Sequence, residues 1–311
     1  MLKPFFKIHL YFFLLIISNR IYGQNFFGSN LYNNIVFSNP SICDFSNHSK
    51  IQMNYRNQWP VADMYTTYGL AAFYGSERMN SNFGMVLKHD RQLKGVFTNT
   101  IIGLNYAYSI KTGYRSHLNF GLNGNYGFEK NDYSKLTFEF PQANMPENKG
   151  RSYPYVNTGV SYVFGRKSTL GLSVVNFLGI NNSIGNKQEY HACYLGSYRI
   201  NRRGNYPLEV EPIGSVAFKN NSVHISYGGN IVFSTIKTGV LLGHSNQNLH
   251  TTSFLLGILY NNFDFIYTYD LNLSGAISIN PKMAAHEVTF LSKLQYKGKR
   301  KKRGAIKCPD I

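Results

Sequence analysis

The chain has 311 residues, of which 43% are hydrophobic, 15% aromatic and 15% charged, and its formal net charge is +17. A mean hydropathy of −0.26 excludes a bundle of membrane-spanning helices, because each such helix needs about 20 consecutive apolar residues. The 24 Tyr, 23 Phe and 28 Gly residues argue against disorder and favour strands over helices.

Residues 1–23 have the features of a secretory signal peptide. Lys3 and Lys7 give a positively charged start, residues 10–17 form a short apolar stretch, and Gly23 offers a small residue before a cleavage point at Gln24. The alternative is an uncleaved membrane anchor, which the short apolar stretch disfavours. We therefore expect residues 1–23 to be absent from the mature protein.

Residues 24–49 are predicted to pack inside or beneath the folded body rather than to form a strand. This segment is rich in Asn and Ser, and its aromatic residues Phe26, Phe27, Tyr32 and Phe37 are candidate anchors. Each would contribute roughly 1.5–3 kcal/mol if fully buried. The alternative is a disordered leader.

Residues 50–296 alternate between two kinds of side chain. Between Leu118 and Phe128, apolar and aromatic residues share one parity, whereas Asn and Gly share the other. A period of two predicts strands, and small polar residues suit the lumen of a membrane barrel. We expect fourteen strands, at 50–59, 65–74, 80–90, 97–110, 115–130, 152–164, 168–178, 191–199, 206–218, 222–234, 237–244, 250–260, 263–270 and 285–296.

The predicted fold is all-β: a closed antiparallel transmembrane β-barrel with long extracellular loops and short periplasmic turns. Closure is required because lipid cannot satisfy the backbone groups of a free sheet edge. The three longest predicted connections, 131–151, 179–190 and 271–284, all follow odd-numbered strands. An even strand count places both termini on the periplasmic side of the outer membrane.

Residues 297–311 form a basic tail that we expect to lie in the periplasm, outside the barrel. Seven positive charges fall between Lys297 and Lys307, and a block of like charge is usually solvated and extended. Nucleic acid is not an expected partner of an exported protein. Cys43, Cys193 and Cys308 are either three separate thiols or include a bridge between Cys43 and Cys308.

The sequence contains no recognisable catalytic, metal-binding or cofactor-binding motif. There is no G-x-G-x-x-G, P-loop, H-E-x-x-H or G-x-S-x-G pattern. Asp264 and Asp270 could be paired carboxylates, but such residues are more often lumen-facing groups beside Lys or Arg. We therefore expect a protein that is not an enzyme and that needs no cofactor.

Several segments of the chain resemble the PorP/SprF family. The opening between Gln24 and Ser41 resembles the family's Q-x-x-x-F…N-x-x-x-x-N-P start, and residues 55–68 resemble its R-x-Q-W-P…T-T-Y segment. Residues 269–275 and 286–288 resemble its Y-D-x-x-x-S-G…H-E pair, and the tail resembles its basic Cys-Pro terminus. In the first hairpin the motif residues are Arg56, Gln58, Trp59 and Pro60.

The resemblance implies a non-enzymatic outer-membrane component of the type IX secretion system. It would support the secretion or surface attachment of an adhesin-like protein, with gliding motility as one setting. Its expected partners are that secreted protein, periplasmic secretion components and the lipid bilayer. The alternative is a passive porin or small-solute transporter. A docking role is expected for tail residues Lys299, Arg300, Lys301, Lys302, Arg303, Ile306, Cys308 and Pro309.

Overall fold

The computed structural model describes residues 31–60, 63–136, 147–165, 168–179, 188–200, 208–219, 222–246, 250–272 and 284–295. These residues form one antiparallel sheet and one α-helix, α2 (Leu31–Ser38), with two short 3₁₀ turns, η2 (Leu93–Gly95) and η3 (Tyr133–Lys135). The strands are β1 (His48–Gln58), β2 (Tyr65–Ser76), β3 (Ser81–Gln92), β4 (Phe97–Gly113), β5 (Ser116–Asn131), β6 (Lys149–Phe164), β7 (Ser168–Gly179), β8 (Glu189–Gly196), β9 (Tyr198–Arg199), β10 (Leu208–Lys219), β11 (Ser222–Phe233), β12 (Ile236–Ser245), β13 (His250–Tyr260), β14 (Phe263–Asn272) and β15 (Ala285–Gln295).

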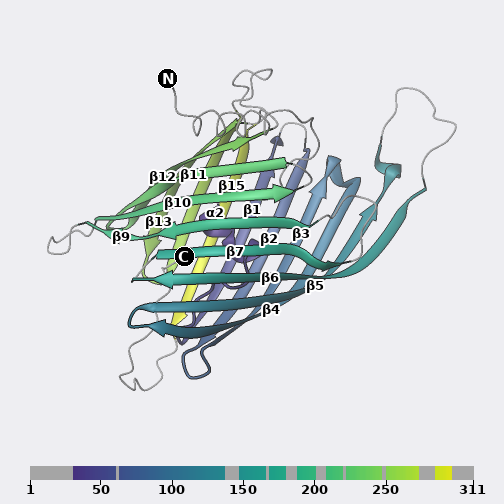
Figure 1. The fold of residues 1–311 in the computed structure, drawn as a ribbon. Helices are drawn as coiled ribbons and strands as arrows, with labels where there is room; N and C mark the ends of the chain where they lie inside the picture. The colour runs from purple at the N-terminus through teal and green to yellow at the C-terminus, as the bar shows by residue number, and fades with distance from the viewer. Residues whose placement is uncertain are drawn as a thin grey trace, which may run out of the picture.

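The sheet closes on itself (Figure 1). The first strand, β1, pairs with the last, β15, in a register that sets His48 opposite Gln295, and β10 pairs with β11. Every strand of the ring therefore has a neighbour on each side, which satisfies the backbone groups without a free edge. The predicted closed antiparallel barrel is confirmed.

Strands β8 and β9 are one barrel strand that is interrupted at Ser197. The neighbouring strand, β10, pairs with β8 from Ile213 onward and with β9 at Glu209 and Val210. Pro212 lies between these two stretches and has no N–H to donate to the ladder. The fifteen labelled strands thus make fourteen barrel strands, and the strand predicted at 191–199 is broken because of a proline on its neighbour.

The two faces of the wall differ as the alternation predicts. On β4, Leu104 is 68% exposed on the outer face, whereas Ala107 on the inner face is fully buried. On β5, Asn119, Gly121 and Asn123 face inward. All predicted strand ends lie within three residues of the observed ones.

The two ends of the barrel carry connections of different length. The longest connections, residues 132–148, 180–188 and 273–284, leave the same end, which we call the long-loop end. At the other end, the short-turn end, β4 joins β5 through residues 114–115 and β13 joins β14 through 261–262. β1 begins and β15 finishes at the short-turn end. Within the described part of the chain, no helix is long and apolar enough to cross a membrane.

Candidate functional site

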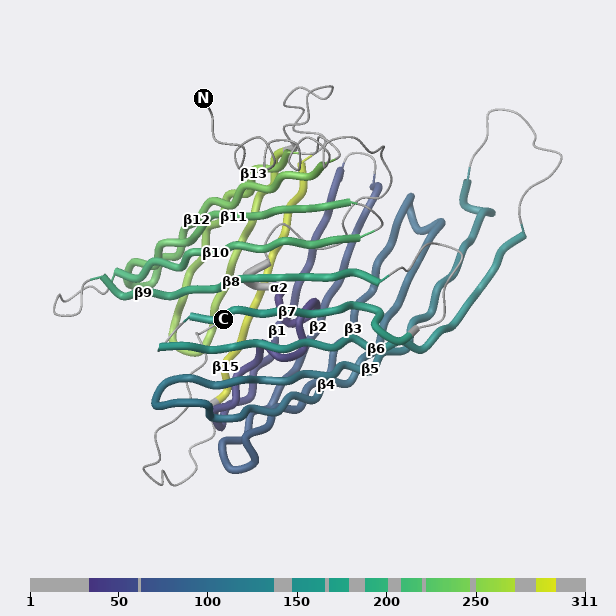
Figure 2. Tube along the Cα trace, in the orientation of Figure 1, coloured from purple at the N-terminus to yellow at the C-terminus, as the bar shows by residue number. Residues whose placement is uncertain are grey.

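The helix α2 and the chain that follows it lie inside the barrel (Figure 2). We call residues 31–46 the lumen segment. Its side chains Ile35, Ile42 and Phe45 are at most 2% exposed, although they belong to a short helix and an irregular stretch rather than to the wall. Such burial requires the surrounding strands to enclose the segment.

An apolar core joins the lumen segment to different sides of the wall. Ile35, Val36 and Ile42 form one cluster with inward-facing wall residues on β2, β3, β8, β10 and β12. Those wall residues are Ala71, Phe73, Val86, Cys193, Leu195, Ile213 and Leu241. Burial of this apolar surface stabilises the segment within the lumen, because the same surface would be exposed to water in an open pore.

Two wall glycines allow the main chain of the lumen segment to approach closely, and a third faces the side chain of Asn39. A Cβ at Gly121 would lie 2.3 Å from the carbonyl carbon of Pro40 and from the backbone N of Ser41. At Gly75 it would lie 2.3 Å from the Ser46 carbonyl oxygen, and at Gly159 it would lie 2.2 Å from the Asn39 side chain. The close atoms at Gly75 and Gly121 belong to the main chain, so no side chain fits there and these two positions require glycine.

Wall side chains donate hydrogen bonds to the carbonyl groups of the same stretch. The amide Nδ2 of Asn105 donates to the Pro40 oxygen at 3.3 Å, and the Ser161 hydroxyl donates to the Ser41 oxygen at 3.2 Å. Asn82 donates to the Asp44 oxygen at 2.5 Å. The small polar residues of the inner wall therefore satisfy buried carbonyl groups of the lumen segment.

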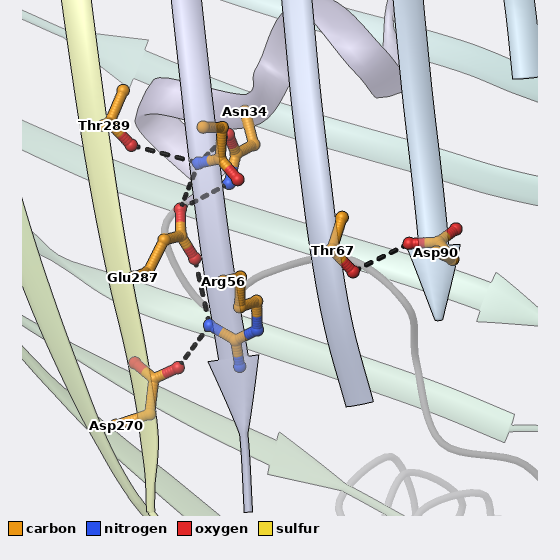
Figure 3. Close-up of polar contacts among 8 residues, drawn as sticks. Asn34, Arg56, Thr67, Asp90, Asp270, Glu287 and Thr289 are labelled. Carbon is orange, nitrogen blue, oxygen red and sulfur yellow. Dashed lines mark hydrogen bonds and ion pairs between the residues drawn. The ribbon is translucent and has the colours of Figure 1, made fainter. Parts of the chain in front are cut away.

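Charged residues from three distant motifs meet on the inner wall where β14, β15 and β1 lie side by side (Figure 3). The Arg56 guanidinium is 2.6 Å from an Asp270 carboxylate oxygen and 2.9 Å from Oε2 of Glu287. Arg56 belongs to the R-x-Q-W-P motif, Asp270 to the Y-D motif and Glu287 to the H-E motif. We call this group, together with Asn34, Asn54 and Thr289, the motif cluster.

The motif cluster also holds the helix in the lumen. The second carboxylate oxygen of Glu287 accepts hydrogen bonds from Asn34 of α2 at 2.7 Å and from Asn54 of β1 at 2.9 Å. Asn54 is also 3.0 Å from the Thr289 hydroxyl. Glu287 is fully buried, so its charge depends on these donors and on Arg56. The arrangement links the first strand, the last strand and the lumen segment.

Other carboxylates of the inner wall also lie beside cations. Asp90 lies 3.0 Å from the Lys88 ammonium. It also accepts a hydrogen bond from Thr67 at 2.7 Å (Figure 3). Asp264 lies 3.3 Å from the Lys293 ammonium. Asp264 and Asp270 thus each have a cationic neighbour, as expected from the sequence. Among the residues that the structure describes, no group of three or more His, Cys, Asp or Glu side chains could hold a metal ion.

The other residues of the first hairpin lie at the end of β1. Gln58 is the last residue of the strand, and the Trp59 backbone N–H donates to the Ala284 oxygen at 3.0 Å. Trp59 has a φ of 57°, and its ring meets Tyr65 edge-on with centroids 5.5 Å apart. Pro60 follows outside the strand.

The expected docking residues of the tail, Lys299 through Pro309, lie outside the described residues, as do residues 1–30 and Cys308. Cys43 is buried within the lumen segment, and Cys193 of β8 is buried in the apolar core of the wall. The Cys43 sulfur lies 3.9 Å from the carbonyl oxygens of Pro40 and Ser41.

Of the aromatic anchors predicted for residues 24–49, Phe37 is partly buried against the apolar core, whereas Phe26 and Phe27 lie outside the described residues. The sequence analysis did not predict the motif cluster or the wall residues that form the apolar core. Arg56 and Glu287 become neighbours only because β1 pairs with β15, which sets them directly opposite each other in the register. The sequence does contain a pattern that could have predicted the apolar core. In residues 70–73 and 240–242, the inward-facing positions of the strand are apolar as well as the outward-facing ones. In a barrel wall, such a pattern indicates that the lumen-facing surface is apolar there as well as the lipid-facing surface.

Comparison with known proteins gives one family. The chain matches the model described as type IX secretion system membrane protein PorP/SprF over residues 22–291. No curated protein sequence matches the chain.

Several solved outer-membrane proteins are similar in fold. Omp33 of Acinetobacter baumannii has a TM-score of 0.46 at 8% identity, over 82% of this chain and 100% of that one. A FadL homologue of Pseudomonas aeruginosa has a TM-score of 0.43 at 10% identity, over 84% of this chain and 96% of that one.

Proposed function

This chain belongs to the PorP/SprF family of type IX secretion system membrane proteins, and from that premise we propose what its filled barrel does. It acts in the outer membrane as a non-enzymatic component that supports the secretion or surface attachment of an adhesin-like protein. Gliding motility is one process that such an attached protein would serve. The barrel is a structural partner for another protein rather than a route for small solutes.

The observation that supports this proposal is the buried core within the lumen. Ile35, Ile42 and Phe45 of the lumen segment are buried where a porin would hold water. Wall residues on several strands pack against Ile35 and Ile42, and Ala107 and Val163 of the wall form a second cluster with Phe45. The porin alternative would need this apolar contact to open, which would expose apolar surface on both sides. A filled lumen leaves the outer rim and the termini as the surfaces for partners.

The tail supplies a second part of the proposal. We infer that both termini are periplasmic and that residues 297–311 dock on an acidic surface of a periplasmic secretion component. β1 begins and β15 finishes at the short-turn end, so the chain leaves the last strand at the end opposite the three longest connections. Its seven positive charges would favour an acidic partner.

The test compares native cells that lack the protein with cells complemented by the full chain. Surface proteins are identified on intact cells, and the uptake of small solutes is measured in the same cultures. We expect the deletion to remove one or a few large secreted proteins from the surface and to leave solute uptake unchanged. Heat-modifiable migration of the complementing chain confirms that the barrel is inserted.

The opposite pattern would contradict the proposal. If the surface proteins stay in place and solute uptake falls, the protein is a porin. If neither changes, the chain supports no secreted partner under the conditions of the assay and the proposal is wrong for that cell.

A further inference from the structure

The hairpin of β5 and β6 extends beyond the neighbouring strand β7 at the long-loop end (Figure 1). On one side, β6 pairs with β5 from Val163 to Lys149. On the other side, it pairs with β7 only from Phe164 to Tyr155. Within the described part of the chain, residues 149–154 of β6 therefore have a neighbouring strand on one side only. We call their other side the free edge.

The main-chain groups of alternate β6 residues point to the free edge. The N–H of Asp132, the residue after β5, donates to the Val96 oxygen at 2.7 Å, so even-numbered residues of β5 bond to β4 and odd-numbered ones bond to β6. In the ladder between β5 and β6, odd-numbered residues stand opposite odd-numbered ones. The N–H and C=O groups of Gly150 and Ser152 therefore point away from β5. Pro154 has the same parity, as expected for a residue that has no N–H to donate.

The free edge lies outside the bilayer. β6 has 16 residues, whereas a tilted strand crosses a bilayer with about 9–11. Counted from Phe164 at the short-turn end, about eleven residues reach Pro154, which leaves residues 149–153 in water beyond the long-loop end of the span. Residues 149–152 are exposed. Water is the medium that an open edge needs, because lipid cannot satisfy its main-chain groups.

The charge of the free edge selects the kind of strand that fits it. Lys149 and Arg151 both have the parity of the inner wall. In the ladder with β5, Arg151 stands opposite Glu129, whereas Lys149 stands opposite the neutral Asn131. A second copy of this chain is disfavoured, because two such edges paired antiparallel would bring their cations together on one face. An incoming strand with acidic side chains at alternate positions would place carboxylates beside these cations instead.

We propose that the free edge of β6 binds an extended, acidic segment of the secreted partner as an added β-strand. Gly150 and Ser152 each donate one main-chain hydrogen bond to the incoming strand and accept one from it. The acidic side chains of that strand lie beside Lys149 and Arg151. Pro154 limits the new ladder, because it has no N–H at the next bonding position. This inference rests on the proposed function, since it takes the secreted protein as the partner.

Binding of a synthetic strand to the purified full chain in nanodiscs tests the free edge without the secreted protein. The probe is a short peptide of alternating Glu and Val, and the control peptide has Lys in place of Glu. We expect fluorescence anisotropy to show binding of the Glu peptide alone. Hydrogen exchange at the Gly150 and Ser152 amides should slow when the Glu peptide is bound. Equal binding of the two peptides, binding without that slowing, or no binding of either would overturn the proposal.

Two substitutions at one position separate the main chain from the side chain. Ser152→Pro removes an N–H that points to the free edge, so the ladder with β5 stays intact. It should lower the affinity for the Glu peptide about fivefold or more, the factor for one lost main-chain hydrogen bond. Ser152→Ala keeps that N–H and removes only the hydroxyl, which accepts from the Tyr126 phenol at 3.2 Å, so it should bind like the unaltered chain. Equal affinities of the two variants would contradict the proposal.

The same two variants in native cells separate this proposal from the proposed function. Both should show the heat-modifiable migration of an inserted barrel. Ser152→Ala should restore the surface proteins that the deletion removes, and Ser152→Pro should not. If Ser152→Pro restores them, the partner binds elsewhere, so the free-edge proposal fails while the proposed function stands. If the deletion itself removes no surface protein, the proposed function fails, and the peptide measurement alone decides whether the free edge accepts a strand.

Discussion

Arg56 neutralises two carboxylates that lie inside the barrel wall. Its guanidinium contacts Asp270 at 2.6 Å and Glu287 at 2.9 Å, and its own side chain is 14% exposed. Arg56→Met keeps the length of the side chain but leaves both carboxylates without a cation. We expect it to lower the free energy of unfolding by about 3 kcal/mol or more, measured by urea unfolding from lipid vesicles.

The matched control is Arg91→Gln. Arg91 also pairs with a carboxylate, that of Asp63 at 3.0 Å, but both side chains of this pair are about two-fifths exposed. A pair in this position is expected to contribute roughly 0–1 kcal/mol. Equal losses in the two variants would show that the buried cluster has no special structural role.

Trp59 tests whether the first-hairpin motif serves architecture or partner binding. Its ring packs edge-on against Tyr65, and its backbone N–H ties β1 to Ala284. Trp59→Ala removes the ring contact, which is worth roughly 0.5–1.5 kcal/mol, and should reduce the fraction of folded barrel in the outer membrane. A normal barrel yield with loss of surface display of the secreted protein would instead assign the hairpin to the partner.

At the scale of elements, the strands could be predicted well from the sequence. Packing of residues 24–49 inside or beneath the body was also predicted, whereas the helix α2 and the wall residues that it contacts were not. Apolar and small polar side chains alternate along residues such as Leu118–Phe128 because they point to opposite faces of the barrel wall. This alternation predicts the ends of the strands to within three residues. The helix α2 has no such signal, because its eight residues fold against the wall rather than by their own periodicity. The break at Ser197 is caused by Pro212 on another strand, which no local pattern reveals.

The glycines beneath the lumen segment permit a test within a single strand. Gly121→Ala places a Cβ 2.3 Å from the main chain at Pro40 and Ser41, so the segment must shift. Overpacking of this kind costs about 1–3 kcal/mol. We expect faster proteolysis within residues 31–46 in the membrane-embedded protein, with the barrel itself still intact.

Gly124→Ala on the same strand is the control, because its added Cβ points into open space. It should leave the lumen segment as resistant to protease as it is in the unaltered chain. If both variants are cut at the same rate, the close approach at Gly121 does not hold the segment in place.

The basic tail should be separable from the barrel. Deleting residues 298–311 removes most of its positive charge but none of the described strands. We expect insertion to stay normal and delivery of the secreted protein to fail. Attraction by charge alone should fade as the Debye length falls from about 10 Å at 0.1 M salt to about 3 Å at 1 M. Normal delivery would remove the docking role, and failed insertion would assign the tail to assembly.

At the scale of the whole molecule, a closed wall surrounds its own N-terminal segment. The wall has an apolar outer face for lipid and a mostly polar inner face, but that inner face includes an apolar region formed by residues such as Phe73, Leu195 and Leu241. An apolar region on the inner wall is unfavourable in contact with water and favourable against Ile35 and Ile42. The wall and the lumen segment thus form one folded unit.

The central claim is that this unit is closed to small solutes, and liposome flux tests it directly. The purified full chain is reconstituted into liposomes, and the entry of a small sugar is followed by swelling. We predict no swelling above that of empty liposomes for the unaltered chain, and measurable swelling for Gly121→Ala, whose lumen segment is displaced. Rapid swelling with the unaltered chain, at the rate of an open porin, would contradict the account.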